Sequence, residues 1–286
     1  MSLLSLRNYP RIPLDGATVI VTGGARGIGR ATAELFHERG ATVHLGDIDA
    51  DLAETAAREI GVRAHAAHLD VTSARSWQTF VEGVIAESGS IEILVNNAGV
   101  MPLGAFDAED DAVSKLTLNV NVVGPMNGMK TVIPHMITAG KGHIVNVASM
   151  AGKMAFPGMV VYNASKFGAV GLTAGARAEY SRSGVSISAI LPSAVRTELS
   201  SGVKLGAVLP TVDPEDIAKA VVGTLRSRRA ETTIPRYLAG LNRISPLIPE
   251  LVWDLARRAA NDRRGLDEVD EVGRKAYADR VSKQAF

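Results

Sequence analysis

The sequence contains no cysteine among its 286 residues. Disulfide bonds, thiolate metal sites and thiol nucleophiles are therefore excluded, and the absence suits a reducing compartment. An excess of charge of one sign is also missing, because 31 Lys and Arg residues face 30 Asp and Glu residues for a net charge of +1. This balance gives no reason to expect a nucleic-acid or strongly acidic partner.

Histidine is scarce, and the six histidines form no metal-binding motif. His65 and His68 are three positions apart on a predicted strand, so their side chains point to opposite faces. We therefore assign no metal. No apolar run approaches the ~20 residues of a membrane-spanning helix, and the N-terminus lacks the apolar core of a signal peptide. We expect a soluble, cytoplasmic protein.

A glycine-rich turn follows the first predicted strand, residues Ala17 to Val21, and a helical pattern follows the turn. The turn carries glycines at positions 23, 27 and 29. Such a turn between a strand and a helix lets backbone N–H groups approach a pyrophosphate at the positive end of the helix. The sequence therefore predicts a dinucleotide site here.

Asp47 closes the second predicted strand, at about the distance from the glycine turn where a carboxylate accepts hydrogen bonds from the adenosine ribose. The alternative is that Asp47 caps the helix beginning near Asp49. Asp49 or Asp51 could serve as that cap instead.

Three side chains between Gly142 and Phe167 are candidates for chemistry. Ser149 follows a predicted buried strand, and Tyr162 and Lys166 lie four positions apart on a predicted helix. The Lys166 ammonium is expected to lower the pKa of the Tyr162 phenol, which would otherwise be a poor base at neutral pH. The alternative is a buried phenol beside a solvated ammonium.

The spacing of Ser149, Tyr162 and Lys166, with the pattern T-G-x-x-x-G-x-G from Thr22 to Gly29, resembles the short-chain dehydrogenase/reductase family. The resemblance covers about Gly16 to Pro235. It implies an α/β fold with a doubly wound parallel sheet of the Rossmann type. It also implies an NAD-dependent oxidoreductase that interconverts a secondary alcohol and a ketone.

The resemblance also assigns site residues. The implied catalytic residues are Asn121, Ser149, Tyr162 and Lys166. Asn121 lies in an N-x-x-G context that Asn119 does not match, within a long helix from Asp110 where a kink would serve a proton relay. The implied cofactor-binding residues are Gly23, Arg26, Gly27, Ile28, Gly29, Asp47, Asp70, Val71, Asn97, Ala98, Gly99, Tyr162, Lys166, Val195 and Thr197.

Two features bear on the cofactor. Ser193 stands where the family usually has a glycine, so the family pattern does not determine the conformation of the loop before Val195. Arg26 could pair with the 2′-phosphate of NADP, whereas Asp47 would accept from the free 2′-hydroxyl of NAD. Because Asp47 would repel a phosphate, we expect NAD to be the cofactor.

The substrate is expected to be a hydrophobic and bulky small-molecule alcohol or ketone. Apolar residues between the catalytic serine and tyrosine support this expectation, namely Met150, Met154, Phe156, Met159 and Val160. A mobile lid is predicted from Glu198 to Pro210, with apolar residues Leu199, Val203, Leu205, Val208 and Leu209.

We expect residues 1–240 to form the dinucleotide-binding and catalytic domain and residues 241–286 a C-terminal helical extension with a charged tail. An apolar stripe is predicted to pack over the substrate side or against another subunit, with Leu247, Ile248, Leu251, Val252 and Leu255. The alternative for this stripe is a peripheral membrane helix. We expect a homodimer or homotetramer.

Two other functions remain open on the sequence alone. The same residues could serve an epimerase or dehydratase that holds NAD tightly. The fold could also be a non-catalytic dinucleotide-binding scaffold. The presence of Ser149, Tyr162 and Lys166 argues against the scaffold.

Overall fold

A computed structural model describes residues 9–202, 210–240, 266 and 269–285. Its centre is a sheet of seven parallel strands in the order β3-β2-β1-β4-β5-β6-β9. The expected doubly wound α/β fold is confirmed. The strands of this sheet are β1 (Thr18–Thr22), β2 (Thr42–Asp47), β3 (Ala64–His68), β4 (Ile93–Asn96), β5 (Gly142–Val147), β6 (Val185–Pro192) and β9 (Glu231–Ile234).

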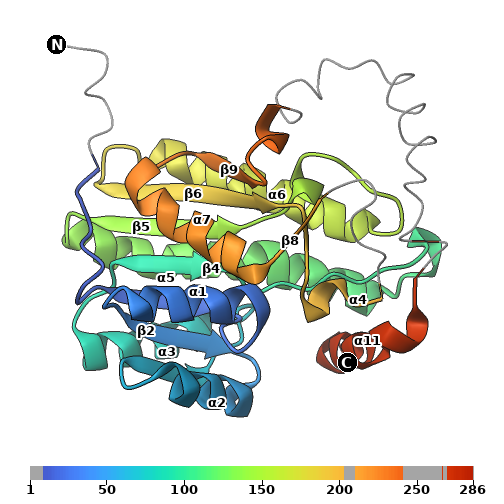
Figure 1. Ribbon diagram of the computed structural model, residues 1–286, viewed down its shortest axis with the longest axis horizontal. Helices are drawn as coiled ribbons and strands as arrows, with labels where there is room; N and C mark the ends of the chain where they lie inside the picture. The colour runs from blue at the N-terminus through green and yellow to red at the C-terminus, as the bar shows by residue number, and fades with distance from the viewer. Residues whose placement is uncertain (1–8, 203–209, 241–265, 267–268, 286) are drawn as a thin grey trace.

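Helices cover both faces of the sheet. Figure 1 shows α1 and α7 in front of it and α5 and α6 behind it. The helices are α1 (Gly27–Glu38), α2 (Ala50–Ile60), α3 (Ala74–Ser88), α4 (Asp111–Leu118), α5 (Gly124–Thr138), α6 (Val160–Glu179), α7 (Pro214–Ser227) and α11 (Glu271–Ala285).

The alternation of strand side chains builds a core on each face. Val19 and Val21 of β1 pack in a cluster with residues of α1 and α7, whereas Ile20 packs in a cluster with residues of α3 and α5. Successive strand residues point to opposite faces, so an entirely apolar strand is buried on both sides.

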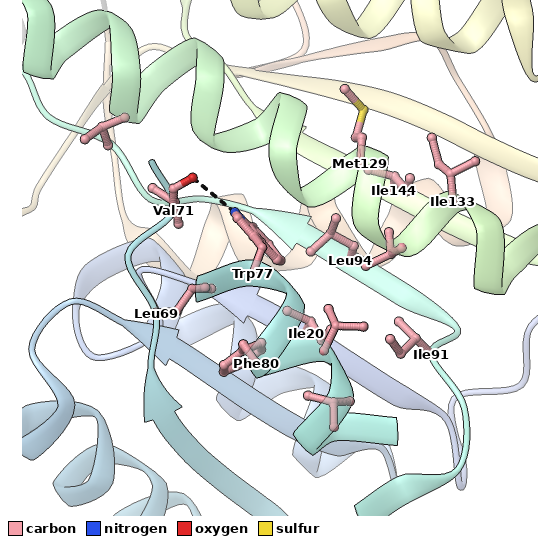
Figure 2. Packing of buried hydrophobic residues seen from close by; sticks show 14 of the residues in the cluster. Ile20, Leu69, Val71, Trp77, Phe80, Ile91, Leu94, Met129, Ile133 and Ile144 are labelled. Atoms are coloured by element: carbon pink, nitrogen blue, oxygen red, sulfur yellow. Dashed lines mark hydrogen bonds between the residues drawn. The ribbon is translucent and has the colours of Figure 1, made fainter. Parts of the chain in front are cut away.

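Among the described residues, Trp77 of α3 is the largest fully buried side chain, and it lies in the cluster that contains Ile20 and Leu94 (Figure 2). Its ring nitrogen donates a hydrogen bond to the Val71 carbonyl at 3.1 Å. A buried indole needs such a partner. The bond holds the segment after β3 against the core, and this segment borders the predicted cofactor site.

The strand order reverses between β1 and β4, because β2 and β3 lie on one side of β1 and the later strands on the other. In such sheets ligands bind beyond the carboxyl ends of the strands at the point of reversal. A second sheet pairs β7 (Ala194–Val195) with β8 (Thr211–Val212) beyond the end of β6.

The helical winding changes around Asn121, where the sequence analysis expected a kink. α4 and α5 are separated by a π-helical turn, Asn119–Val123, and Asn121 is buried in it. Such turns let a helix bend where a side chain must be aimed. The sequence prediction described this region as one helix, and the π-helical turn divides it.

The C-terminal predictions are tested only in part. The apolar stripe from Leu247 to Leu255 and most of the proposed lid lie outside the described residues, so both stay predictions. The charged tail contains a helix, α11, that the sequence analysis did not predict. Within the described ranges, no helix has the length and apolar character to cross a membrane.

Two glycine substitutions test the packing of the glycine turn. A Cβ at Gly29 would clash with the carbonyl oxygen of Gly23, and that oxygen belongs to rigid backbone. We expect Gly29→Ala to lower the free energy of unfolding by about 1–3 kcal/mol, as overpacking does.

Gly83→Ala is the matched control, because Gly83 lies in α3 and a Cβ there meets nothing within 4 Å. We expect this change to stabilise the protein by about 0.5–1 kcal/mol through helix propensity. Urea unfolding measures both. Equal effects of the two substitutions would show that the turn is not tightly packed.

Candidate active site

One cavity of about 690 Å³ lies beyond the carboxyl ends of the central strands. Every predicted site residue lines it except Gly29 and Asn121, which lie behind its wall. The fold therefore brings together residues that the sequence spreads from position 23 to position 197. A volume of this size suits a dinucleotide or substrate of moderate size.

The glycine turn fits a pyrophosphate. Gly23 and Gly27 have φ of 61° and 55°, which residues with a Cβ rarely adopt. A Cβ at Gly23 would lie 3.0 Å from the Ala98 Cα, so the turn packs directly on the segment after β4. The backbone at the start of α1 is thus left uncovered toward the cavity, where its N–H groups can meet an anion.

The segment after β4 is tied to β1. The Asn97 side-chain amide donates to the carbonyls of Thr22 and Gly23, at 3.0 and 3.1 Å. The Thr22 hydroxyl accepts from the backbone N–H groups of Asn97 and Ala98. Asn97 therefore joins the two strand ends that border the cavity.

Asp47 is buried and lines the cavity. Its carboxylate accepts from the backbone N–H groups of Ala25 and Asp49, both at 3.1 Å. The cap of α2 is Asp49, which accepts from the Leu52 N–H. Asp47 is therefore not the helix cap, and its carboxylate is positioned beside the glycine turn.

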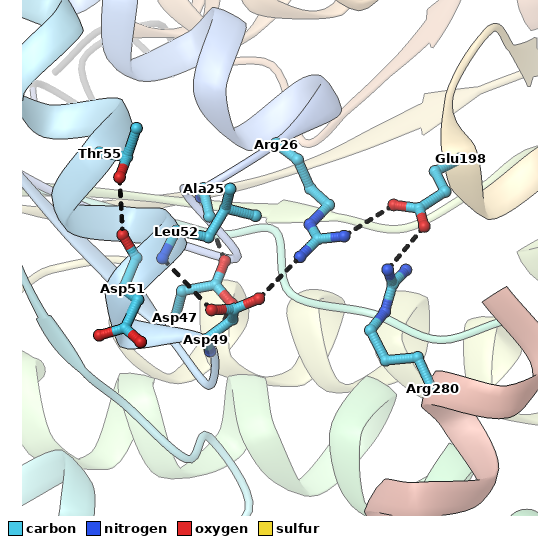
Figure 3. Close-up of polar contacts among 9 residues, drawn as sticks. All are labelled: Ala25, Arg26, Asp47, Asp49, Asp51, Leu52, Thr55, Glu198 and Arg280. Atoms are coloured by element: carbon cyan, nitrogen blue, oxygen red, sulfur yellow. Dashed lines mark hydrogen bonds and ion pairs between the residues drawn. The ribbon is translucent and has the colours of Figure 1, made fainter. Parts of the chain in front are cut away.

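Arg26 is held between two carboxylates. One end of its guanidinium pairs with Asp49 at 3.1 Å and the other with Glu198 at 2.8 Å, while Glu198 also pairs with Arg280 of α11 at 2.6 Å (Figure 3). Burial opposes ionisation of Glu198, but Arg280 and Arg26 outweigh it and lower its pKa. These four residues form a chain of ion pairs along the cavity.

Asp70 and Val71 follow β3 and line the cavity. The Asp70 carboxylate accepts from the backbone N–H and the hydroxyl of Thr72, at 2.9 and 2.7 Å. The Val71 carbonyl accepts from Trp77 and Asn127. Both predicted residues are thereby fixed at the edge of the cavity.

Ser193 is accommodated without a positive φ. Its backbone N–H donates to the Ile234 carbonyl at 2.9 Å, and its hydroxyl donates to the Pro210 carbonyl at 2.6 Å. The residue that departs from the family pattern therefore ties β6 to the segment before β8. Val195 and Thr197 follow and line the cavity as expected.

Ser149 and Tyr162 meet at the far end of the cavity. Ser149 lies just beyond β5, and its hydroxyl accepts from the Ala151 N–H at 3.1 Å. Tyr162 lies in the first turn of α6 and is 6% exposed. Burial raises the pKa of the Tyr162 phenol, and a hydrogen bond with Ser149 acts against that rise.

Lys166 lies one helical turn beyond Tyr162, with its Nζ 5.6 Å from the centroid of the phenol ring. The Nζ donates to the Val147 carbonyl at 3.2 Å, and burial lowers the pKa of Lys166 to about 8. The expectation that Tyr162 would have a lowered pKa is therefore wrong for this structure. Burial disfavours the phenolate more than the hydrogen bond with Ser149 favours it.

Asn121 lies behind these residues. Its side-chain carbonyl accepts from the Val100 N–H at 2.9 Å, and its amide donates to the Val100 carbonyl and the Ser165 hydroxyl. These bonds join the π-helical turn to the segment after β4 and to α6. A part for Asn121 in proton relay stays a prediction.

Comparison with known proteins settles the family. Residues 17–206 match the family model described as short chain dehydrogenase. The chain belongs to this family. It is an oxidoreductase whose site suits a nicotinamide dinucleotide, because the glycine turn and the cavity beside it fit such a cofactor.

Three relatives place this short-chain dehydrogenase more closely. It is 36% identical to oxidoreductase UcpA of Salmonella typhimurium over 220 residues, 76% of this chain and 82% of the relative. It is 32% identical to a 3-alpha-(or 20-beta)-hydroxysteroid dehydrogenase of Mycobacterium tuberculosis over 228 residues, 79% and 83% of the two chains. A 3-ketoacyl-(acyl-carrier-protein) reductase from Brucella melitensis, solved with NADH, superposes with a TM-score of 0.71 at 26% identity, covering 77% and 96%.

The substrate end of the short-chain dehydrogenase cavity is mainly apolar. Met150, Phe156 and Met159 line it, as the sequence analysis expected. Met154 and Val160 do not, because Met154 packs in a separate cluster and Val160 is 44% exposed. Of the predicted lid residues, the described Leu199 lines the cavity.

Sequence reasoning missed the residues that α11 brings to the site. Tyr277, Arg280, Val281, Lys283 and Gln284 line the cavity. Arg274, Tyr277 and Val281 lie on one face of a helix at helical spacing, but charged residues dominate the segment and obscure this pattern. A search for buried arginine and tyrosine at that spacing could have found them.

The lowered pKa of Lys166 predicts a stability cost. Below pH 8 the folded protein must hold a buried ammonium, and between its pKa of about 8 and the ordinary lysine pKa of 10.5 it sheds the proton that the unfolded chain keeps. The free energy of unfolding therefore rises with pH through this window. We expect Lys166→Met to stabilise the protein at pH 7 by about 1–3 kcal/mol, less than the full shift because the bond to Val147 is lost.

Urea unfolding at pH 7 and pH 10 measures the effect, which we expect to be smaller at pH 10. Lys130→Met is the control, because Lys130 is exposed on α5. If Lys166→Met is no more stable than Lys130→Met at pH 7, the buried ammonium does not lower the free energy of unfolding.

Proposed function

We propose that the protein interconverts a secondary alcohol and a ketone, with NAD as the cofactor and a hydrophobic molecule as the substrate. The observation that carries the proposal is the Tyr162 phenol, buried in an apolar cavity between the Ser149 hydroxyl and the Lys166 ammonium. A proton donor and acceptor beside a second hydroxyl is what reversible oxidation of an alcohol requires.

Each residue has a part in the proposed reaction. Ser149 donates a hydrogen bond to the substrate oxygen and holds it beside the phenol. Tyr162 takes the hydroxyl proton during oxidation and returns it during reduction. Lys166 stabilises the phenolate that forms, because its positive charge lies within 5.6 Å of the ring. The bound nicotinamide supplies the site that accepts or donates the hydride.

The raised pKa of Tyr162 means that the phenol keeps its proton until a more basic alkoxide develops on the substrate. Lys166 has a pKa of about 8 and is mostly charged at neutral pH, so its ammonium can stabilise the phenolate. The two groups therefore serve the proposed reaction in either direction.

The hydrophobic substrate is supported by the walls of the cavity. Met101, Phe156 and Leu199 pack in the cluster around Tyr162, and apolar walls recognise apolar molecules. The relative from Mycobacterium tuberculosis is named for hydroxysteroids, which are large apolar alcohols. This name supports the class of substrate and does not identify the molecule.

Three acidic residues near the glycine turn, Asp47, Asp49 and Glu198, support the preference for NAD. Asp47 would meet a 2′-phosphate inside the cavity, where like charges ~4 Å apart cost about 4 kcal/mol at an effective dielectric of 20. Arg26 could offset this cost only by leaving Asp49 or Glu198, which hold both ends of its guanidinium. The solved relative from Brucella melitensis is named as a complex with NADH.

The first test is Tyr162→Phe, which removes the proton donor and keeps the ring. We expect the kcat of alcohol oxidation to fall by ~10² to 10⁴, the usual contribution of a general acid or base. NADH binding, measured by fluorescence, should be unchanged. Tyr237→Phe is the control, because Tyr237 is 69% exposed and lies outside the cavity. Activity within a few-fold of the unmodified protein would remove Tyr162 from the proposed part.

The second test concerns the cofactor. We expect NAD to be preferred over NADP by at least about tenfold in kcat/KM, equivalent to about 1.4 kcal/mol. Asp47→Asn keeps an acceptor for the Ala25 N–H but removes the charge, so it should narrow the gap mainly by improving NADP. Asp51→Asn is the control on the exposed face of α2. Equal use of both cofactors by the unmodified protein would refute the preference.

A further inference from the structure

Helix α11 lies outside the segment that matches the family, which ends at residue 206, yet it lines the same cavity as Tyr162. Figure 1 places α11 beside α4, at the end of the sheet toward which β8 lies. The segment that follows β4 and the segment that follows β7 both contact this helix. A part of the chain beyond the shared fold thus belongs to the site.

Arg274 fastens α11 to both segments at once. Its guanidinium donates to the carbonyls of Leu199 and Ser201, at 3.2 and 2.8 Å, and to the carbonyl of Met101. The side chain is 5% exposed, and burial lowers its pKa. A buried guanidinium without these acceptors would be costly, so the three bonds fix the position of the helix.

The start of α11 packs closely on Gly202. The Asp270 N–H donates to the Gly202 carbonyl at 2.8 Å. A Cβ at Gly202 would lie 2.6 Å from the Asp270 carbonyl oxygen and 2.9 Å from the Arg274 Cβ. This approach leaves no room for the helix to slide along the segment after β7.

Only one face of α11 is buried. Arg274, Tyr277 and Val281 point inward, while Val272 is 88% exposed and Lys275 pairs with Asp279 along the outer face at 2.9 Å. The helix therefore has a single rotational setting. That setting directs Tyr277 and Val281 into the cavity.

Three contacts hold the Tyr277 side chain in place. Its hydroxyl accepts from the Met101 N–H at 2.7 Å, and the guanidiniums of Arg274 and Arg280 lie 4.7 and 5.3 Å from the ring centroid. Cations at these distances are attracted to an aromatic face. A ring fixed in this way is a rigid wall rather than a side chain that moves aside.

Tyr277 is also close to the catalytic residues. Met101, to which its hydroxyl is bound, packs in the same cluster as Tyr162 and Leu199. Burial is the main cause of the raised pKa of Tyr162, Ser149 acts against it, and the charge of Tyr277 adds to it. The two phenols therefore interact electrostatically.

We propose that α11 forms the outer wall of the substrate site and that Tyr277 determines how large a substrate can reach Tyr162. This inference rests on the proposed oxidation of hydrophobic alcohols. The part of the wall that Tyr277 forms selects apolar groups, because the hydroxyl of Tyr277 is engaged by Met101 and the ring lines the cavity. A bulky group on the carbon skeleton of the substrate would meet the Tyr277 ring.

The alternative is that α11 only braces the two segments. A brace and a wall differ in what a truncation does. Loss of a brace lowers stability and slows all substrates alike. Loss of a wall changes the order in which substrates of different size are used.

The test uses the full chain with three alcohols of increasing bulk, 2-butanol, 2-octanol and a saturated steroid alcohol, with NADH formation followed by absorbance. We expect Tyr277→Ala to raise kcat/KM for the steroid alcohol relative to 2-butanol by about tenfold or more, the scale on which a pocket distinguishes molecules that differ by a few carbons. Tyr277→Leu, which keeps an apolar buried side chain, should give a smaller shift in the same direction.

Lys275→Ala is the matched control on the outer face of the same helix. We expect its ratio of kcat/KM for the steroid alcohol to kcat/KM for 2-butanol to stay within about twofold of that of the unmodified protein. Thermal unfolding shows whether each variant is folded. If Tyr277→Ala does not fold, Tyr277→Leu decides the matter. A uniform loss of kcat/KM for all three alcohols, with an unchanged ratio of steroid alcohol to 2-butanol, would contradict the role of Tyr277 in substrate size. It would show that α11 only braces the two segments.

A second readout separates this inference from the proposed function. If the unmodified protein binds NADH but oxidises none of the alcohols, the proposed function fails. The wall is then tested by fluorescence with 1-anilinonaphthalene-8-sulfonate, bound to the protein saturated with NADH. We expect Tyr277→Ala to strengthen its binding by at least about fivefold and Tyr277→Leu to strengthen it by less, because removing the ring opens space for a bulky molecule, while Lys275→Ala leaves the affinity unchanged. Equal affinities in all variants would overturn the wall.

Discussion

The structure depends on the close approach of two strand ends, β1 and β4. Four hydrogen bonds join Thr22 and Gly23 to Asn97 and Ala98 across this junction, and Gly23 packs against the backbone of Ala98. The approach is possible because neither Gly23 nor Gly29 has a side chain. Every other part of the site is placed relative to this junction, since the sheet reverses its order there.

Burial at the far end of the cavity sets the chemistry and also its cost. Tyr162 and Lys166 are both 6% exposed, so the charged form of each is disfavoured. The two groups share one helical face, so a phenolate and an ammonium would stabilise each other where neither is stable alone. A site of this kind is less stable than a wholly apolar one. In the proposed reaction, the same burial makes proton transfer between Tyr162 and a substrate easier.

Ion pairs connect parts of the chain that are far apart in sequence. Asp49, Arg26, Glu198 and Arg280 come from α2, the glycine turn, the segment after β7 and α11 (Figure 3). All four side chains are partly exposed, so each pair contributes little to stability by itself. Their effect is geometric, because they hold the Arg26 guanidinium between Asp49 and Glu198 and hold α11 against the cavity.

The sequence by itself determined the features that depend on local spacing. The glycines at positions 23, 27 and 29 and the four-residue interval from Tyr162 to Lys166 specify a turn and a helical face wherever the chain folds, and the break near Asn121 follows from a polar residue in a helix. Only the tertiary structure decided the direction of the Tyr162 pKa, the accommodation of Ser193 and the place of α11. Burial, acceptor carbonyls and the wall of a cavity are supplied by residues distant in the chain, and local pattern carries no record of them.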